Sequence, residues 1–165
     1  MKFDLAKLRP ALQNRRYRAV ATAVALIVAI ALVWFLFPRA LPKTASLGGV
    51  SLNMEYAVTD TELAVGLSGR ASIPDNYGML FVFNAPNKHP FWAKGMLVPF
   101  DLFWIDTKGQ VIGIETNIRP ESYPNVFYPP SPVRYVLETR AGFADDHAIA
   151  VGSWLTLKNL IGVSK

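Results

Sequence analysis

The sequence predicts a mainly β domain, a compact antiparallel β-sandwich or barrel with one or two short helices, preceded by an N-terminal transmembrane helix. Three observations lead to this fold class. Residues 50–160 contain short apolar runs that are separated by turn residues. Signals for helices are few in the same residues. One long uncharged segment lies ahead of them, near the N-terminus.

The net charge of +5 belongs to the N-terminal tail and not to the domain. Residues 1–18 hold six basic residues and one acidic residue, whereas the remainder of the chain holds 11 of each. A basic face that could neutralise phosphates is therefore not expected on the domain, and we predict no nucleic-acid partner. The chain has no cysteine, which excludes disulfides and thiolate metal sites.

Residues 19–37 form the predicted membrane anchor, because they carry no charge and Thr22 is their one polar residue. As a helix they would be about 28 Å long, close to a hydrocarbon core of about 30 Å. Trp34 and Phe35 suit the membrane interface, and Pro38 ends the helix. A cleaved signal peptide is the alternative, but its apolar region usually spans about 7 to 15 residues. We therefore predict a retained, single-pass signal anchor.

Charge asymmetry predicts the orientation of this anchor. The basic tail, residues 1–18, is expected to stay in the cytoplasm, so the domain lies on the outer, extracytoplasmic side of the membrane. The predicted divisions are the tail at 1–18, the transmembrane helix at 19–37, a linker at 38–49 and the β domain at 50–160.

The domain is expected to consist of short strands with two helical turns. Residues 50–58 alternate between apolar and polar side chains, as a half-exposed strand does. Thr59 and Glu62 have the spacing of a capping box, which predicts a short helix after that strand. Further strands are predicted at 78–83, 91–96, 100–106, 111–118, 133–139 and 154–157, with a helical turn at 145–149 and a proline-rich loop at 119–132.

Several short motifs follow one another in a fixed order between about residues 48 and 158. They are Gly66-Leu67-Ser68-Gly69-Arg70, residues 78–83, Phe91-Trp92-Ala93-Lys94, Pro99-Phe100-Asp101, and Tyr135-Val136-Leu137-Glu138 with Ala141-Gly142. This order resembles the family known as domain of unknown function 192. The resemblance implies a compact, mainly β domain, often secreted or tethered by an N-terminal apolar segment, with no assigned activity.

The chain departs from the pattern of that family at three places. The usual Met-Lys-Asn-Thr after the tryptophan is here Ala93-Lys94-Gly95-Met96. Ser68 stands in place of a methionine, and Phe100 in place of an aliphatic residue. Any shared site that used the asparagine and threonine would be altered in this chain, whereas the lysine and the aspartate remain.

Lys94 and Asp101 are the first candidate site residues. If the strands on either side of Leu97 and Val98 close in a tight loop, positions 94 and 101 lie opposite each other, with Cβ atoms about 5 Å apart. Such a pair could form a polar centre in an apolar cleft and bind an anionic or polar ligand. The structural alternative, an ion pair or an aspartate held by backbone amides, is preferred.

The remaining charged candidates are Arg70, Glu138 and the two histidines. Arg70 and Glu138 each adjoin apolar residues and could pair with each other or with Lys94, which favours a structural role. His89 and His147 have no partner at a metal-ligand spacing, so we predict exposed loop histidines and no metal site. No phosphate loop, dinucleotide fingerprint or EF-hand pattern is present, and no cofactor is predicted.

Aromatic residues supply the last candidates. Trp92, with the neighbouring aromatic residues, could line a ligand groove, although aromatic residues at strand spacing more often belong to a core. Tyr123, Phe127 and Tyr128 lie in the proline-rich loop and are candidates for contact with a partner. The alternative is that this loop folds over the barrel and buries them.

Three hypotheses about function follow from these residues. The preferred one is a membrane-anchored domain that binds a small ligand, an envelope polymer or an envelope protein. The second is an enzyme of hydrolase or lyase type that uses Lys94, Asp101 and His89. The third is a structural or assembly factor of a membrane complex. Binding is preferred because the sequence offers no nucleophile, base and orienting residue as a set.

Overall fold

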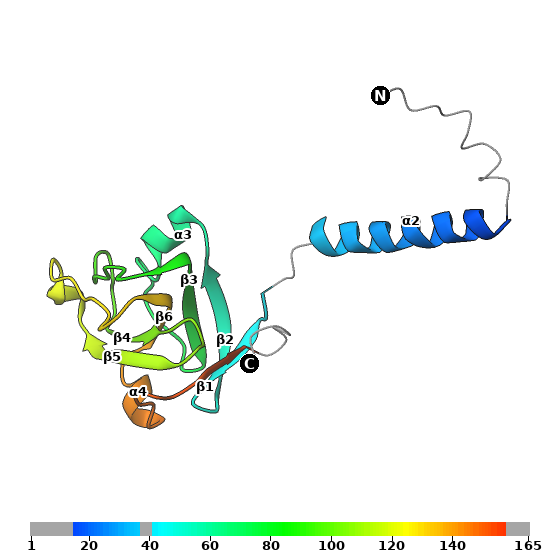
Figure 1. Ribbon diagram of the computed structural model, residues 1–165. Coiled ribbons are helices and arrows are strands. Elements are labelled where there is room, and N and C mark those ends of the chain that lie inside the picture. Colours follow the sequence, from blue (N-terminus) through cyan, green and yellow to red (C-terminus); the bar gives the residue numbers. More distant parts are fainter. Residues whose placement is uncertain (1–14, 37–40, 158–165) are drawn as a thin grey trace. The chain divides into compact units, whose positions relative to one another are not determined.

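The computed structural model describes residues 15–36 and 41–157, and the chain divides into two compact units between residues 40 and 41. The first unit contains the helix α2 (Arg15–Leu36), drawn in blue in Figure 1. Its side chains are described for residues 19–30, and these are exposed. Among the described residues, no helix combines the length and apolar character that crossing a membrane requires. Three parts of the predicted divisions lie outside the described residues, namely 1–14, 37–40 and 158–160.

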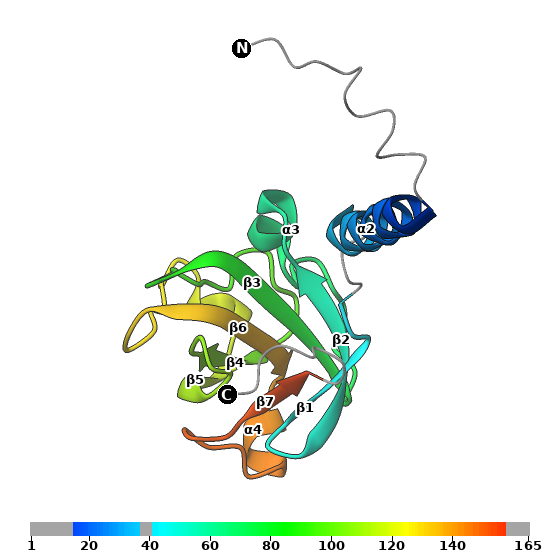
Figure 2. The same cartoon turned by 45° about the vertical axis from the view of Figure 1, so that its right-hand side comes forward.

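The second unit is a curled sheet of seven strands with a few short helices (Figures 1 and 2). The order of strands across the sheet is β5-β4-β6-β3-β2-β1-β7. The strands are β1 (Thr44–Leu47), β2 (Val50–Ala57), β3 (Tyr77–Asn87), β4 (Phe100–Ile105), β5 (Val111–Ile118), β6 (Val133–Arg140) and β7 (Leu155–Leu157). The short helices are α3 (Asp60–Val65), α4 (Phe143–Asp146) and the 3-10 turn η2 (Pro120–Ser122).

The enclosed face of the sheet holds one of the two hydrophobic clusters, and all seven strands contribute to it. Phe143 and Ala144 of α4 pack into the same cluster. Main-chain hydrogen bonds bring the two edges of the sheet together. The amide of Val111 donates to the carbonyl of Ser153 (2.9 Å), and the amide of Leu155 donates to the carbonyl of Gly109 (2.8 Å). The sheet thus curls around its inner cluster, with the edges joined at one end.

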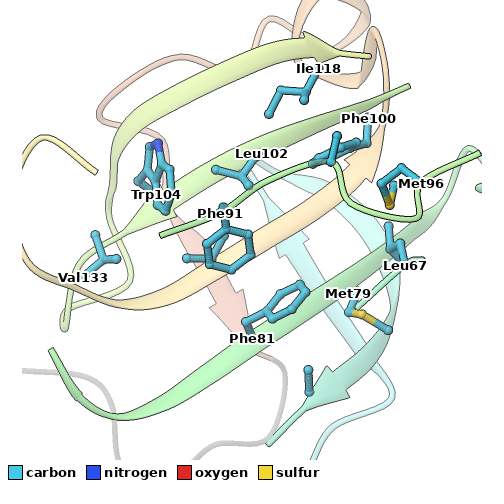
Figure 3. Packing of buried hydrophobic residues seen from close by; sticks show 13 residues of the cluster. Leu67, Met79, Phe81, Phe91, Met96, Phe100, Leu102, Trp104, Ile118 and Val133 are labelled. Carbon is cyan, nitrogen blue, oxygen red and sulfur yellow. The ribbon is translucent and has the colours of Figure 1, made fainter. Parts of the chain in front are cut away.

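The outer face of β3, β4 and β6 carries the second hydrophobic cluster, shown in Figure 3. The ring of Phe91 packs edge to face against Phe81 (centroids 4.9 Å apart) and against Trp104 (5.5 Å). Leu67 and Met96 pack into this cluster from the loops that follow α3 and precede β4. Strands at the centre of the sheet are therefore buried on both faces, which explains why all six residues of β4 are buried.

The mainly β prediction is confirmed, but the expected antiparallel sandwich or barrel differs from the structure in one respect. Strands β2 and β3 pair in parallel, with Asn53 opposite Tyr77 and Ala57 opposite Phe81. The other strand pairs of the sheet are antiparallel. A parallel pair needs a crossover connection, and the segment that contains α3 provides it.

Two predictions of local structure were wrong. Residues 91–96 do not form a strand, because the amide of Met96 turns back to the carbonyl of Ala93 (3.2 Å) and Gly95 has a positive φ of 74°. Phe91 alone forms a bridge, with Phe127. The predicted linker, 38–49, contains β1, which pairs with β2 through a turn at Gly48 and Gly49. Both glycines have positive φ, which a two-residue hairpin turn of type I′ requires.

Candidate functional site

A cavity of about 300 Å³ lies on the outer face of the sheet, between α3, β3, β6 and the loop at 89–96. Its lining is largely apolar and aromatic. The rings come from Phe81, Phe83, His89, Phe91 and Trp92, and the aliphatic side chains and thioether from Leu63, Ala64, Val65, Leu67 and Met96. The charged residues of the lining are Asp60, Lys94 and Glu138. A mostly apolar cavity with few polar groups is the usual form of a small-molecule site.

Glu138 is the buried polar group of this cavity. It lies on β6 opposite Met79 of β3, and it shares the outer face of the sheet with Val136 because side chains alternate along a strand. The side chain is only 4% exposed, and its Oε2 atom has no hydrogen-bond partner among the described residues. Burial raises the pKa of the Glu138 carboxyl to about 8, although the backbone amide of Leu67 and the charge of Arg70 act against that rise.

The roof of the cavity is the crossover between β2 and β3. Helix α3 starts with the predicted capping box, in which Glu62 N donates to Thr59 Oγ1 (3.3 Å) and Thr59 N donates to Glu62 Oε2 (2.9 Å). Beyond the helix, Ser68 Oγ donates to the carbonyl of Lys94 (2.9 Å), and the amide of Gly69 donates to the carbonyl of Gly95 (2.8 Å). These bonds join the crossover to the loop at 89–96 and fix both walls of the cavity.

The rim of the cavity is partly open. Trp92 is 42% exposed, and Lys94 and Asp60 are exposed. Lys94 forms no ion pair with any described residue. The ring of His89 stacks on Phe83, with centroids 3.5 Å apart and planes 10° apart, and its Nε2 lies 3.3 Å from the carbonyl oxygen of Ala85. His89 is therefore half-buried against an aromatic wall and is not the exposed loop residue that was predicted.

The structure does not bring Asp101 to Lys94. Asp101 alternates with Phe100 and Leu102 of the outer cluster, so its side chain points to the enclosed face of the sheet, whereas Lys94 lies on the outer side. Thr139, and not Lys94, is its opposite residue. The predicted register fails because 91–96 is a turn.

Asp101 instead has the structural role that the sequence analysis preferred. Its Oδ1 accepts a hydrogen bond from the amide of Asn117 (2.8 Å), and its Oδ2 accepts one from the amide of Ala144 (2.9 Å). The carboxylate is fully buried and ties α4 and the end of β5 to β4.

Arg70 also has a partner other than the predicted one. Its guanidinium donates to Glu55 (2.7 Å) and to the hydroxyl of Tyr77 (2.9 Å), so Arg70 and Glu138 do not form an ion pair. The hydrogen bond from Arg70 lowers the pKa of Glu55. This group lies next to a second cavity of about 270 Å³, which shares Val65 and Gly66 with the first.

The proline-rich loop exposes Tyr123 and Tyr128, while Phe127 is half-buried and exchanges two main-chain hydrogen bonds with Phe91. The loop therefore reaches the wall of the cavity through Phe127, and its two tyrosines remain predictions for partner contact.

His147 packs against Phe143 of α4 (centroids 4.6 Å). No group of three metal-ligating side chains occurs among the described residues.

Comparison with known proteins places this geometry in a family. Residues 43–157 match the model of domain of unknown function 192, described as "Uncharacterized ACR". The chain belongs to this family. The search of curated proteins gave no match.

Two solved structures resemble this member of domain of unknown function 192. A protein of unknown function from Novosphingobium aromaticivorans has a TM-score of 0.65 and 27% identity, over 68% of this chain and 82% of the other. A protein named as a candidate transcription regulator from Sinorhizobium meliloti has a TM-score of 0.67 and 27% identity, over 75% of this chain and 100% of the other.

In this member of domain of unknown function 192, the cavity unites four of the six predicted ligand residues, namely Trp92, His89, Lys94 and Glu138. Asp101 and Arg70 lie elsewhere. The covering of the cavity by the crossover was not predicted, because an amphipathic helix of six residues gives no sign of what its apolar side covers. One signal was available: Glu138 shares a strand face with the apolar Val136, and a carboxyl on an apolar face is unusual.

Proposed function

We propose that this chain is a membrane-tethered, extracytoplasmic domain that binds a small, largely apolar ligand in the outer-face cavity. The observation that carries the proposal is Oε2 of Glu138, a buried carboxyl oxygen with no described hydrogen-bond partner beside an apolar cavity. A buried polar atom without a partner costs about 1 to 3 kcal/mol. A ligand with one complementary polar group would remove that cost, and a cavity of about 300 Å³ has the size of a small-molecule site.

Binding is favoured over catalysis by the positions of the polar groups. The enzyme hypothesis required Lys94, Asp101 and His89 to act together, but Asp101 accepts two backbone amides on the enclosed face. The hydroxyl of Ser68, the one that lines the cavity, donates to a carbonyl and has no adjacent base among the described residues. A nucleophile, a base and an orienting residue therefore do not meet around this cavity.

The description of the Sinorhizobium meliloti protein as a regulator of transcription does not suit the charge of this domain. Residues 41–157 hold 11 acidic and 8 basic residues, which leaves an excess of negative charge. Binding to nucleic acid requires a basic face that neutralises phosphates. A small ligand is also favoured over an envelope polymer, because the cavity has a floor at Glu138 and walls formed by two joined loops.

The tether and its orientation are proposed from the sequence. Residues 19–37 are uncharged, and six basic residues precede them. The chain should remain in the membrane fraction after extraction with alkaline carbonate, and protease added outside intact cells should digest the domain. Release by carbonate, or protection of the domain in intact cells with digestion after lysis, would contradict this part of the proposal.

The binding proposal is tested by blocking the cavity. Saturation-transfer difference NMR with small aromatic fragments should show binding to the full-length chain in lipid nanodiscs. In Ala64→Trp the new indole enters the cavity from α3, so the fragment signals should be lost. Val151→Trp adds the same side chain at an exposed position outside the cavity lining and is the matched control. Equal signals from both variants would refute binding in this cavity.

A further inference from the structure

We propose that the ligand of the outer-face cavity is a small organic cation, an alkyl- or arylammonium compound whose charged group pairs with Glu138. This inference rests on the proposed binding function and names the class of ligand. The inference follows from the buried carboxyl of Glu138, from the aromatic rings that line the cavity and from the positions of the chain's own basic residues.

No described cation of the chain pairs with Glu138. The guanidinium of Arg70 is held by Glu55 and Tyr77, and its side chain lines the second cavity and not the first. Lys94 lines the first cavity, but its side chain is exposed at the rim. A carboxylate enclosed at 4% exposure is stabilised by an opposite charge in contact with it. A counter-charge for the ionised form of Glu138 would therefore have to come from outside the described chain.

Gly66 lies against an aromatic ring and close to this carboxyl. A Cβ atom at position 66 would lie 2.9 Å from the ring of Phe81 and 3.6 Å from Oε2 of Glu138. A larger residue at position 66 would therefore push against the ring of Phe81 beside this carboxyl. Aromatic rings attract cations electrostatically by about 0.5 to 2 kcal/mol, and the attraction is larger when water is excluded.

The rings stand at steep angles to one another, so that they enclose the cavity from several directions. Phe91 is inclined by 79° to Phe81 and by 86° to Phe83, and Trp92 covers part of the rim. The rim carries one acidic residue, Asp60 from α3, and one basic residue, Lys94. A cation with an apolar body fits the combination of aromatic rings with the ionised form of Glu138.

Every titratable group around Glu138 bears on the pH dependence of binding. These groups are Asp60 from α3, Arg70 after it, and His89 and Lys94 from the loop at 89–96. At pH 6.5 the proton of Glu138 is still in place in the free protein, because burial raises the pKa of its carboxyl to about 8. A cation can pair with Glu138 only after that proton leaves, so binding must release it. A neutral ligand would accept a hydrogen bond from the protonated carboxyl and release nothing.

Benzylamine and benzyl alcohol separate these two cases, since they share a ring and differ in charge. Isothermal titration of the full-length chain in phosphatidylcholine nanodiscs, with empty nanodiscs as the blank, should show at least tenfold tighter binding of benzylamine. Titration at pH 6.5 in two buffers of different ionisation enthalpy should show release of about one proton per benzylamine bound. The preference and the proton release should both vanish in Glu138→Gln.

Three results would overturn the inference. Equal or tighter binding of benzyl alcohol would make the ligand neutral while leaving the binding function intact. A preference for benzylamine that survives in Glu138→Gln would place the cation elsewhere. Binding of benzylamine to Lys94→Met but not to the native chain would show that Lys94 itself fills the site. The amine-to-alcohol ratio and the proton release of the native chain need no variant, so they decide the matter even if Glu138→Gln does not fold.

Discussion

Replacing Glu138 by glutamine should make the stability of the domain less dependent on pH. Burial raises the pKa of this carboxyl from 4.5 to about 8, so the folded chain keeps a proton that the unfolded chain has released between these pH values. Because the folded state binds more protons there, stability falls as the pH rises. At about 1.4 kcal/mol per pH unit, the loss approaches about 4 to 5 kcal/mol above pH 8. Glutamine has the same shape and no charge, so the variant should escape this loss.

The measurement is urea unfolding of the full-length chain at pH 5, 7 and 9, followed by tryptophan fluorescence in one non-ionic detergent. Native chain and Glu138→Gln should have similar free energies of unfolding at pH 5, and the variant should be more stable by several kcal/mol at pH 9. Glu121→Gln, at an exposed position, controls for the loss of one negative charge. If the two curves run parallel from pH 5 to 9, Glu138 either is not buried or has a counter-charge. The role proposed for Glu138 in the cavity would then be wrong.

Three further substitutions test the rest of the structure by unfolding measurements. Asp101→Asn should lose about 2 to 3 kcal/mol of stability, because the amide cannot accept from both backbone donors, whereas Lys94→Ala should change little; equal losses would restore the predicted pair. Gly66→Ala should cost about 1 to 3 kcal/mol, since φ is 51° at this position, and a neutral result would contradict that conformation. Glu55→Gln should cost less than about 1 kcal/mol at pH 7, because its bond to Arg70 is partly exposed. Since that bond lowers the pKa of Glu55, its contribution is lost as the pH falls, and the difference in stability between the variant and the native chain should shrink toward acid pH; a difference that stays constant would assign the loss to packing.

The sequence predicted those elements whose signals are local. The alternation in residues 50–58 and the capping box of Thr59 and Glu62 correspond to β2 and α3 within one or two residues. The buried strand at 100–106 and the proline-rich loop were also placed correctly. Each of these signals depends on the residues of a single segment, which the sequence shows directly.

The parts that failed depend on contacts between distant segments. β1 has only four residues and little apolar character, and β2 and β7 on either side determine that it is a strand. The parallel pairing of β2 and β3 is likewise set by where the crossover lies. The two glycines at 48 and 49 were the available signal for the first hairpin.

The site was predicted only in part, because it also depends on contacts between distant segments. Asp101 and Glu138 are both acidic residues within apolar strands, and the sequence alone does not say which face each one enters. The carboxylate of Asp101 accepts hydrogen bonds from two amides on the enclosed face, whereas Oε2 of Glu138 has no described hydrogen-bond partner on the outer face. Alternation identifies residues that share a face, but the segment that covers that face is specified by the tertiary fold.

The meeting of β5 with the segment before β7 bears on how this protein resists aggregation. An open sheet has two free margins that can recruit strands from other molecules. Here the amides of Val111 and Leu155 and the carbonyls of Gly109 and Ser153 satisfy one another across the seam. Local opening at 152–155 would unmask this end of both margins at once. Damage at this seam should therefore cause self-association of the domain before it causes loss of the central strands.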